Sequence, residues 1–208
     1  MQFLLSRVIL CPTSFIVRRS SRLATNLREP QQSFVIISKC NDIYANLSLE
    51  DWLYNNCKLS DSVFGFLMWV NDPCIVIGRH QNPWTECNIN DCIKNGIKIV
   101  RRNSGGGTVY HDQGNLNLCF LSTKQKYCRK RNLQFMSNVL KSKYDIDCEI
   151  TAREDLVLAR TKHKISGTAA KLGAKCAYHH CTLLVNADTS KMRIAIRKNK
   201  SVNSSNHP

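Results

Sequence analysis

The chain has 208 residues, of which 43% are hydrophobic, and its formal net charge is +15. This length supports one domain with a hydrophobic core plus tails, and it is short for two full-sized domains. The charge favours an anionic partner such as nucleic acid, a membrane surface or a phosphorylated ligand, but both ends of the chain inflate it. The 11 cysteines are unevenly spaced in apolar contexts, which indicates free thiols in a reducing compartment.

The N-terminal segment, residues 1–30, has the composition of a mitochondrial transit peptide. Between Met1 and Arg28 it carries several arginines, serines and threonines and no acidic residue. A secretory signal is the alternative, but the apolar runs are short and are broken by arginine and Pro12. We therefore expect a disordered transit segment and a protein of the mitochondrial matrix. No run of about 18 apolar residues occurs, so we expect no membrane-spanning helix and no membrane partner.

The first half of the folded region alternates apolar runs with turn residues, which predicts short strands and helices. Ser48 followed by Asp51 resembles a capping box and predicts a helix from there to about Lys58. The turn Asn71-Asp72-Pro73 separates two apolar runs, which predicts that they form a β-hairpin. The elements expected here are a strand at 34–38, hairpin strands at 63–70 and 74–78, and a helix at 88–95 ended by Gly96.

The second half is richer in strands than in helices. Leu133, Met136, Val139 and Leu140 form one apolar stripe, which predicts an amphipathic helix over 132–144. The remaining strands are expected at 97–102, 116–122, 155–159, 163–169 and 179–186. We therefore predict an α/β fold of the α+β kind, with a mixed β-sheet and helices packed on one side of it. Residues 191–208 are basic and lack apolar periodicity, and we expect a disordered tail there.

The stretch RRNSGGGTVYHDQGNLN, residues 101–117, places three consecutive glycines between two predicted strands. They could form a linker, a tight turn or a cradle for an anionic ligand. The flanking strands argue against a linker, and a turn needs only one or two glycines. Three in a row expose successive backbone N–H groups, which bind anionic oxygens. Neither the P-loop pattern nor the dinucleotide-binding pattern fits, which argues against a nucleotide-hydrolysing switch protein and a dehydrogenase.

A second block, HKISGTAAKLGAKCAYHHCTLLVN at residues 163–186, carries a lysine in a predicted strand followed by small residues. Lys164 could neutralise a phosphate and polarise a carbonyl, or it could be a surface lysine on an edge strand. His179 and His180 lie between two cysteines and invite a zinc site. Adjacent strand residues point to opposite faces, however, so at most one of the two histidines can face a given metal. We therefore expect no metal site.

Five blocks, in this order and spacing, resemble the lipoate-protein ligase A and lipoyltransferase family. The blocks are GRHQNPW at 78–84, RRNSGGGTVYHDQGNLN at 101–117, AREDLVL at 152–158, KISGTAAK at 164–171 and YHHCTLL at 178–184. Their variants are more similar to the animal mitochondrial lipoyltransferases than to the bacterial ligases. The resemblance implies a mixed α/β catalytic domain of the kind shared with biotin protein ligases, over residues 34–190. It stops after Asp188, so we expect an incomplete domain.

The resemblance also implies a binding site for lipoyl-adenylate, in which Lys164 is the catalytic residue and holds the phosphate and acyl oxygens. Contacts to the nucleotide-phosphate part are implied for Arg102, Gly107, Thr108, Val109 and Tyr110. Arg153 and Thr182 would line the same site, and His80 and His111 would support it. The acceptor lysine attacks an activated acyl group, so the enzyme needs position and charge rather than a nucleophile of its own.

The implied reaction moves a lipoyl group from lipoyl-adenylate, or from a lipoylated carrier protein, to the acceptor lysine of lipoyl domains in 2-oxoacid dehydrogenase complexes. Those domains and the glycine-cleavage H protein are the implied partners, and we expect a monomer with no tightly bound cofactor. An ATP-dependent ligase, which would use ATP and Mg, and a non-catalytic binding form are the alternatives. We expect no nucleic-acid partner, because no aromatic RNA-binding signature accompanies the basic residues.

Overall fold

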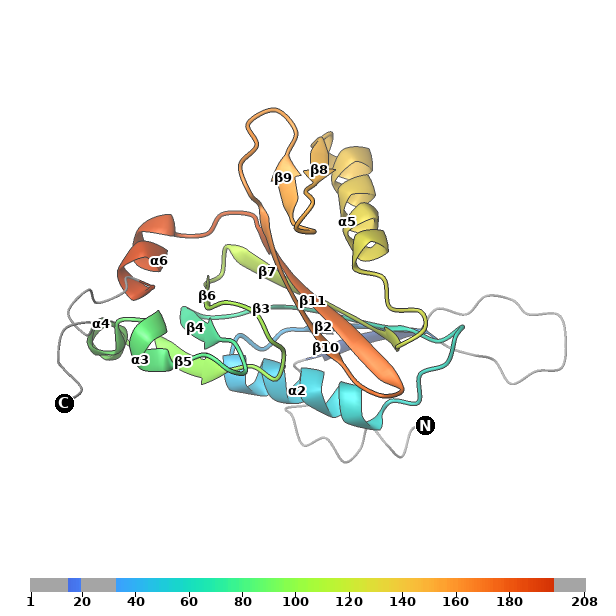
Figure 1. The fold of residues 1–208 in the computed structure, drawn as a ribbon, viewed down its shortest axis with the longest axis horizontal. Coiled ribbons are helices and arrows are strands. Elements are labelled where there is room, and N and C mark those ends of the chain that lie inside the picture. The colour runs from blue at the N-terminus through green and yellow to red at the C-terminus, as the bar shows by residue number, and fades with distance from the viewer. Residues whose placement is uncertain (1–14, 20–32, 197–208) are drawn as a thin grey trace, which may run out of the picture.

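A computed structural model describes residues 15–19 and 33–196 of the chain (Figure 1). Its largest element is a six-stranded sheet with the strand order β1-β2-β3-β7-β11-β10. These strands are β1 (Phe15–Arg19), β2 (Phe34–Ser38), β3 (Gly65–Val70), β7 (Asn115–Thr123), β10 (Ser166–Leu172) and β11 (Cys176–Leu184). All neighbours pair antiparallel except β2 and β3, which are parallel. The prediction of a mixed sheet is confirmed.

Two smaller sheets complete the strands. One has the order β5-β4-β6 and the other pairs β8 with β9. Their bounds are β4 (Cys74–Ile77), β5 (Lys98–Arg101), β6 (Val109–His111), β8 (Cys148–Ile150) and β9 (Leu156–Leu158). The predicted hairpin of 63–70 with 74–78 is wrong, because β3 belongs to the large sheet and β4 to the three-stranded one. Both sides of β3 are already paired, with β2 and β7.

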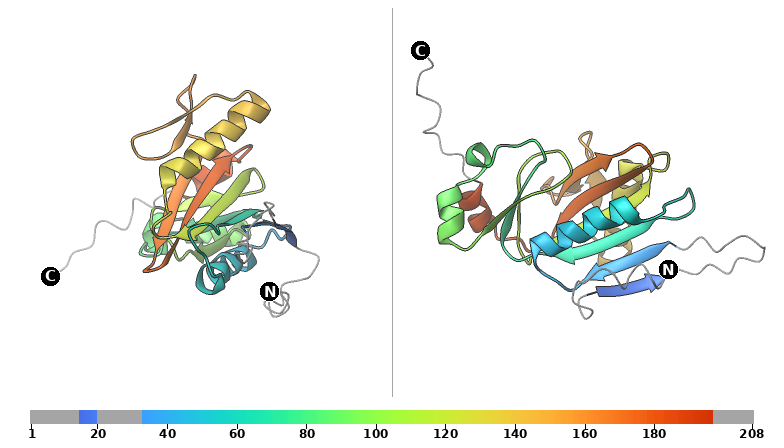
Figure 2. Two further views of the ribbon diagram at one scale, coloured as in Figure 1. Left: turned by 90° about the vertical axis from the view of Figure 1, so that its right-hand side faces the viewer. Right: turned by 90° about the horizontal axis from the view of Figure 1, so that it is seen from below.

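The two long helices cover opposite faces of the large sheet (Figure 2). They are α2 (Ile43–Asn56) and α5 (Arg129–Tyr144). The expectation that the helices pack on one side is therefore wrong. Three short helices, α3 (Pro83–Glu86), α4 (Ile89–Lys94) and α6 (Thr189–Ala195), lie beside the three-stranded sheet (Figure 1).

The N-cap of helix α2 lies six residues before the first residue of the predicted capping box. The Asp42 carboxylate accepts hydrogen bonds from the backbone N–H groups of Tyr44 and Ala45, at 2.7 and 3.1 Å, so Asp42 is the N-cap. Ser48 and Asp51 lie inside the helix. Helix α4 follows the prediction more closely, because Asn88 caps it and Gly96 ends it with a φ of +64°.

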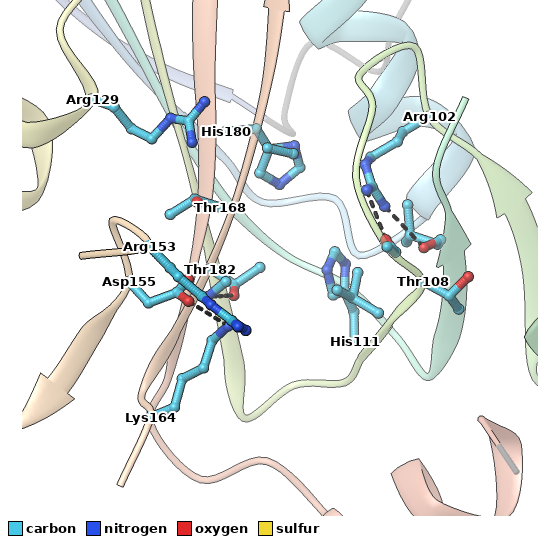
Figure 3. Close-up of a pocket in the computed structure, with 15 residues that line it drawn as sticks. Arg102, Thr108, His111, Arg129, Arg153, Asp155, Lys164, Thr168, His180 and Thr182 are labelled. Carbon is cyan, nitrogen blue, oxygen red and sulfur yellow. Dashed lines mark hydrogen bonds and ion pairs between the residues drawn. The ribbon is translucent and has the colours of Figure 1, made fainter. Parts of the chain in front are cut away.

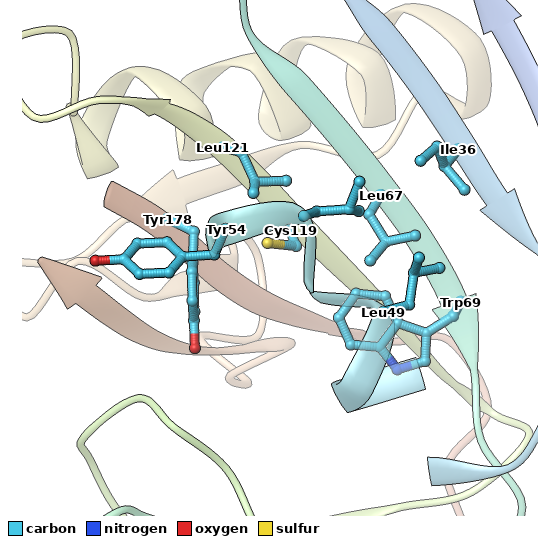
Figure 4. Packing of buried hydrophobic residues seen from close by; sticks show 9 residues of the cluster. Ile36, Leu49, Tyr54, Leu67, Trp69, Cys119, Leu121 and Tyr178 are labelled. Atoms are coloured by element: carbon cyan, nitrogen blue, oxygen red, sulfur yellow. The ribbon is translucent and has the colours of Figure 1, made fainter. Parts of the chain in front are cut away.

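The large sheet has a separate hydrophobic core on each face. The α2 face buries Ile36, Leu49, Leu53, Tyr54, Leu67, Trp69, Cys119, Leu121 and Tyr178 (Figure 4). The α5 face buries Leu118, Leu133, Met136, Leu156 and Cys181. Side chains of consecutive strand residues point to opposite faces, so Leu118 and Cys119 of the central strand serve different cores. This two-sided burial fixes the position of the sheet between the helices.

Every cysteine in the described residues is a free thiol, as predicted. Burial raises the pKa of the Cys57 thiol to about 11 and that of Cys74 to about 12, and it raises the pKa values of Cys119 and Cys181 strongly as well. These thiols are protonated at neutral pH and pack as small apolar side chains.

The two ends of the described chain are more ordered than predicted. Strand β1 pairs with β2 inside the segment 1–30 that we expected to be disordered. Helix α6 lies in the expected tail; Asp188 caps it and Ala195 is fully buried. Both expectations are wrong for these elements, and residues 1–14, 20–30 and 197–208 lie outside the described residues. Within the described part, no helix has the length and apolar character needed to cross a membrane.

Candidate active site

A cavity of about 440 Å³ lies between the glycine loop, strands β10 and β11, and the segment that precedes β9 (Figure 3). It contains every predicted site residue except Tyr110 and His80. Its lining residues are Val76, Arg102, Gly107, Thr108, Val109, His111, Arg129, Arg153, Asp155, Lys164, Gly167, Thr168, Ala169, His180 and Thr182. Segments that are far apart in the chain therefore meet around one cavity.

Arg102 holds the glycine loop in shape. Its Nε and Nη2 donate to the Gly105 carbonyl at 3.2 and 2.7 Å, and Nη2 also donates to the Gly107 carbonyl at 2.7 Å. Nη1 donates to the Val76 carbonyl of β4 at 3.1 Å. Arg102 is only 4% exposed. Most of its N–H donors are used on backbone carbonyls, so its principal role in this structure is to position the loop rather than to face solvent.

The three glycines of this loop differ in what they require. Gly106 has a φ of +92°, a left-handed conformation that favours glycine. The Gly106 carbonyl also approaches Gly78 so closely that a Cβ atom on Gly78 would lie 2.0 Å from it. Gly105 and Gly107 have no atom within 4 Å of the place where a Cβ would be. The loop is therefore neither a slack linker nor a simple turn, and it leaves two stretches of bare backbone at an open surface.

Lys164 lies across the cavity from this loop. Its Nζ is 2.8 Å from Oδ2 of Asp155, and the two side chains are 56% and 15% exposed. An isolated bridge between Val157 and Lys164 places the lysine beside β9. The Thr182 hydroxyl accepts a hydrogen bond from the Gly167 N–H at 2.9 Å, which fixes β10 against β11 next to the lysine. Lys164 thus has a defined position and still reaches solvent.

Strand alternation separates Tyr110 from its neighbours. Val109 and His111 line the cavity, whereas Tyr110 points to the other face of β6 and packs in a core cluster with Ile75 and Cys87. The Tyr110 side chain therefore does not line this cavity, and its contact with the ligand stays a prediction. His80 is exposed and does not line the cavity either.

Several lining residues were not predicted, and His180 is the most deeply buried polar residue among them. Its Nδ1 lies 3.2 Å from Oε1 of Glu50, and both side chains are less than 5% exposed. Its neighbour His179 faces helix α5, where Nδ1 lies 3.3 Å from Nδ2 of Asn132. The two histidines point to opposite faces, as their strand position predicts. Among the residues that the structure describes, no group of three or more His, Cys, Asp or Glu side chains could hold a metal.

Positive charge dominates the cavity. Arg102, Arg129, Arg153 and Lys164 line it, and Asp155 is the single carboxylate among the lining residues. Nε of Arg129 donates to the Tyr127 hydroxyl at 3.2 Å, and its Nη1 lies 3.1 Å from Oε2 of Glu154. A concave site with this excess of cations attracts an anionic ligand.

Acid is expected to destabilise the protein through two buried histidines. Burial, with smaller contributions from Arg129 and His180, lowers the pKa of His179 to about 3, and burial lowers the pKa of His111 well below its usual value. Both side chains are neutral in the folded protein, so the stability that they contribute is complete above about pH 6.5. It is lost as the pH falls from there towards the pKa of the folded state, by about 1.4 kcal/mol per pH unit for each histidine.

Urea unfolding at several pH values measures this effect. We expect the free energy of unfolding to fall by about 3 to 4 kcal/mol between pH 7 and pH 5. In His179→Gln, about half of this pH dependence should disappear. The surface variant His163→Gln should keep the pH dependence of the wild type. If both variants changed this pH dependence equally, it could not be assigned to the buried ring of His179.

Comparisons with known proteins show the family of this chain. The family model described as the lipoyl protein ligase A/B catalytic domain matches residues 42–208. The chain belongs to this family. The match confirms the predicted resemblance, and it extends past residue 190, where we expected the domain to end.

Relatives in the family include mitochondrial lipoyl amidotransferase LIPT1 of Homo sapiens. It is 45% identical over 183 residues, which cover 84% of this chain and 48% of the human protein. Lipoate-protein ligase A of Psychrobacter cryohalolentis is 40% identical over 158 residues, 76% of this chain and 45% of that protein. The chain thus spans about half the length of the curated relatives it matches.

Solved structures of the family share the fold. P. falciparum LipL1 in complex with lipoate superposes with a TM-score of 0.72 at 31% identity, covering 78% of this chain and 51% of that one. A lipoate-protein ligase A bound with ATP has a TM-score of 0.64 at 23% identity, covering 74% of this chain and 66% of that one, and shows the fold alone. These matches confirm the predicted catalytic fold as that of the lipoate-protein ligases.

Proposed function

We propose that this family member transfers a lipoyl group from lipoyl-adenylate, or from a lipoylated carrier protein, to the ε-amine of a lysine in a lipoyl domain. The observation that carries the proposal is the chemistry of the two opposite walls of the cavity. Bare backbone at Gly107 lies on one side, and Lys164 lies on the other. Phosphate and acyl oxygens between these walls would meet N–H donors and a cation.

The transfer needs no covalent enzyme intermediate. The acceptor amine attacks the acyl carbon of the mixed anhydride, the C–N bond forms, and the bond from the acyl carbon to the phosphate oxygen breaks. AMP carries away the electron pair and the amine loses a proton to water. Lys164 would stabilise the developing negative charge on the acyl and phosphate oxygens, and Asp155 would keep the ammonium group in place.

Lys164→Ala is expected to lower the rate of transfer by about 100-fold or more, because it removes the cation that stabilises the developing charge. The measurement is lipoylation of an apo lipoyl domain from lipoyl-adenylate, followed by intact mass. Lys171→Ala is the matched control: Lys171 lies on β10, which begins two residues after Lys164, pairs with Asp51 at 2.9 Å and does not line the cavity. A similar loss in both variants, or full activity in Lys164→Ala, would refute this role.

The same assay separates the proposal from its alternatives. A gain of one lipoyl mass from lipoyl-adenylate supports a transferase. Product from ATP, Mg²⁺ and free lipoate identifies an ATP-dependent ligase. Adenylate that binds measurably and yields no product identifies a non-catalytic binding form and contradicts the proposal for this chain.

The partners and location belong to the same proposal. Acceptors would be the lipoyl domains of 2-oxoacid dehydrogenase complexes and the glycine-cleavage H protein, and the enzyme would act as a monomer in the mitochondrial matrix. Its substrate would be lipoyl-AMP, with no tightly bound cofactor. The transit-like composition of residues 1–30 and the mitochondrial location in the name of the human relative support this placement.

A further inference from the structure

A second cavity, of about 640 Å³, lies on the α5 face of the large sheet. Its walls come from β2, β3 and β7, from the N-terminal half of α5, and from the loop that precedes β3. Its lining residues are Ser33, Val35, Ser60, Asp61, Ser62, Val63, Phe64, Phe66, Phe120, Leu121, Ser122, Lys126, Arg131, Asn132 and Phe135. The volume is within the range of about 300 to 1,000 Å³ that small-molecule sites occupy. None of these residues lines the first cavity.

The walls of this cavity are apolar and aromatic. Phe66 and Phe120 contact each other with ring centroids 4.7 Å apart, and Phe135 lies edge-on to both at 6.4 and 6.2 Å. Phe135 and Phe64 nevertheless remain 53% and 54% exposed. Exposed aromatic rings around a concave surface leave unburied apolar area that an aliphatic ligand would cover.

Three charged residues, Asp61, Lys126 and Arg131, also line the cavity. Lys126 and Arg131 are both exposed, and one N–H of Arg131 donates to the Lys126 carbonyl at 2.6 Å, which holds the loop beside the helix. Among the described residues, neither side chain forms an ion pair. Asp61 is the one lining carboxylate, and its Oδ1 already accepts a hydrogen bond from the Thr123 hydroxyl at 3.0 Å. Two cations beside an apolar cavity complement a ligand with a hydrocarbon body and an anionic head.

We propose that this second cavity binds an aliphatic chain that ends in a carboxylate, with the chain against Phe66, Phe120 and Phe135 and the carboxylate at Lys126 and Arg131. The site is independent of the proposed lipoyl transfer. The first turn of α5 lies between the two cavities, since Arg129 lines the first and Arg131 the second.

The test uses dansyl-undecanoic acid as a fluorescent probe of the full chain. We expect saturable binding that decanoate displaces and decanol displaces less well. Phe135→Glu should raise the Kd of the probe about tenfold or more, because it puts a charge into the apolar wall. Lys126→Glu should raise the Kd for decanoate by several-fold and leave the Kd for decanol within about twofold of wild type, because only the acid has a charge to lose.

Two control variants locate the site. Thr168→Trp narrows the first cavity and Lys143→Glu changes charge at the far end of α5; both should keep the wild-type Kd. Unchanged binding in Phe135→Glu, or a loss confined to Thr168→Trp, would overturn the proposal. A third outcome would also overturn it: the wild type binds no probe and is a dimer, and Phe135→Glu is a monomer. A second copy of the chain would then occupy the cavity. Phe135 is half exposed, so the variant should fold, and circular dichroism checks this.

Discussion

Arg102→Met is expected to lower the free energy of unfolding by about 3 to 5 kcal/mol and to abolish ligand binding in the first cavity. The variant leaves the carbonyls of Val76, Gly105 and Gly107 without the donors they have in the wild type. Each buried acceptor that loses its partner costs about 1 to 3 kcal/mol. The glycine loop also loses the side chain that shapes it, so the loss of binding follows from the same cause.

Urea unfolding followed by circular dichroism measures the effect, and Arg153→Met is the matched control. Arg153 lines the same cavity but is exposed, and it should change the free energy of unfolding by less than about 0.5 kcal/mol. Arg102→Lys should fall between wild type and Arg102→Met, because one ammonium group cannot reproduce the planar fork of the guanidinium. Equal stability of the two methionine variants would show that the hydrogen bonds of Arg102 do not hold the loop.

Gly114→Ala is expected to destabilise the protein by about 2 to 4 kcal/mol. A Cβ atom on Gly114 would lie 2.0 Å from the Asn186 carbonyl oxygen and 2.1 Å from its carbon. Neither backbone can move away freely, because the Gly114 carbonyl accepts hydrogen bonds from the N–H groups of Val185 and Asn186 at 2.9 and 3.0 Å. The substitution therefore breaks the connection between the start of β7 and the segment that leads to α6.

Thermal and urea unfolding measure this change, with Gly107→Ala as the control. Nothing lies within 4 Å of a Cβ on Gly107, so this variant should remain within about 1 kcal/mol of wild type. The two variants make the same chemical change within one segment, and only the space around the new methyl group differs. If Gly114→Ala were as stable as Gly107→Ala, the close approach of Asn186 would not constrain the fold.

Local sequence patterns predicted most of the helices and strands, but they did not predict which strands pair, because pairing depends on contacts between residues far apart in the chain. The apolar stripe that includes Leu133 and Met136 predicted α5, because the spacing of three to four residues that marks one face of a helix can be read within a short stretch of sequence. The turn at Asn71-Asp72-Pro73 is also where the chain leaves β3, yet β3 pairs with β2 and β7 rather than with β4. A turn signal reports only that the chain changes direction. Asp42 stands directly before an apolar segment, which is an N-cap signal, but the capping-box match at Ser48 placed the predicted start of the helix too late.

The site was predictable wherever a motif contained its own chemistry. The glycine loop and Lys164 both stand in unusual local sequence, and the resemblance to the family gave Lys164 its catalytic role. The resemblance to the family assigned Tyr110 to the ligand together with its neighbours, but strand alternation turns the Tyr110 side chain into the core. Asp155 lies nine positions before Lys164, and only the bridge at Val157 brings the two charges together. Arg129 reaches the cavity because α5 begins there, which no local pattern specifies.

Cys119 and Cys181 lie on adjacent strands and face opposite cores, and both are fully buried. A thiol reagent in solution can reach Cys119 only after the α2 layer separates from the sheet, and Cys181 only after the α5 layer separates. Cys128, which is exposed, reacts without any such opening. Pulsed alkylation read by peptide mass would therefore time the two separations independently in one sample. The wild-type chain carries its own reporters of whether its two cores open together or in sequence.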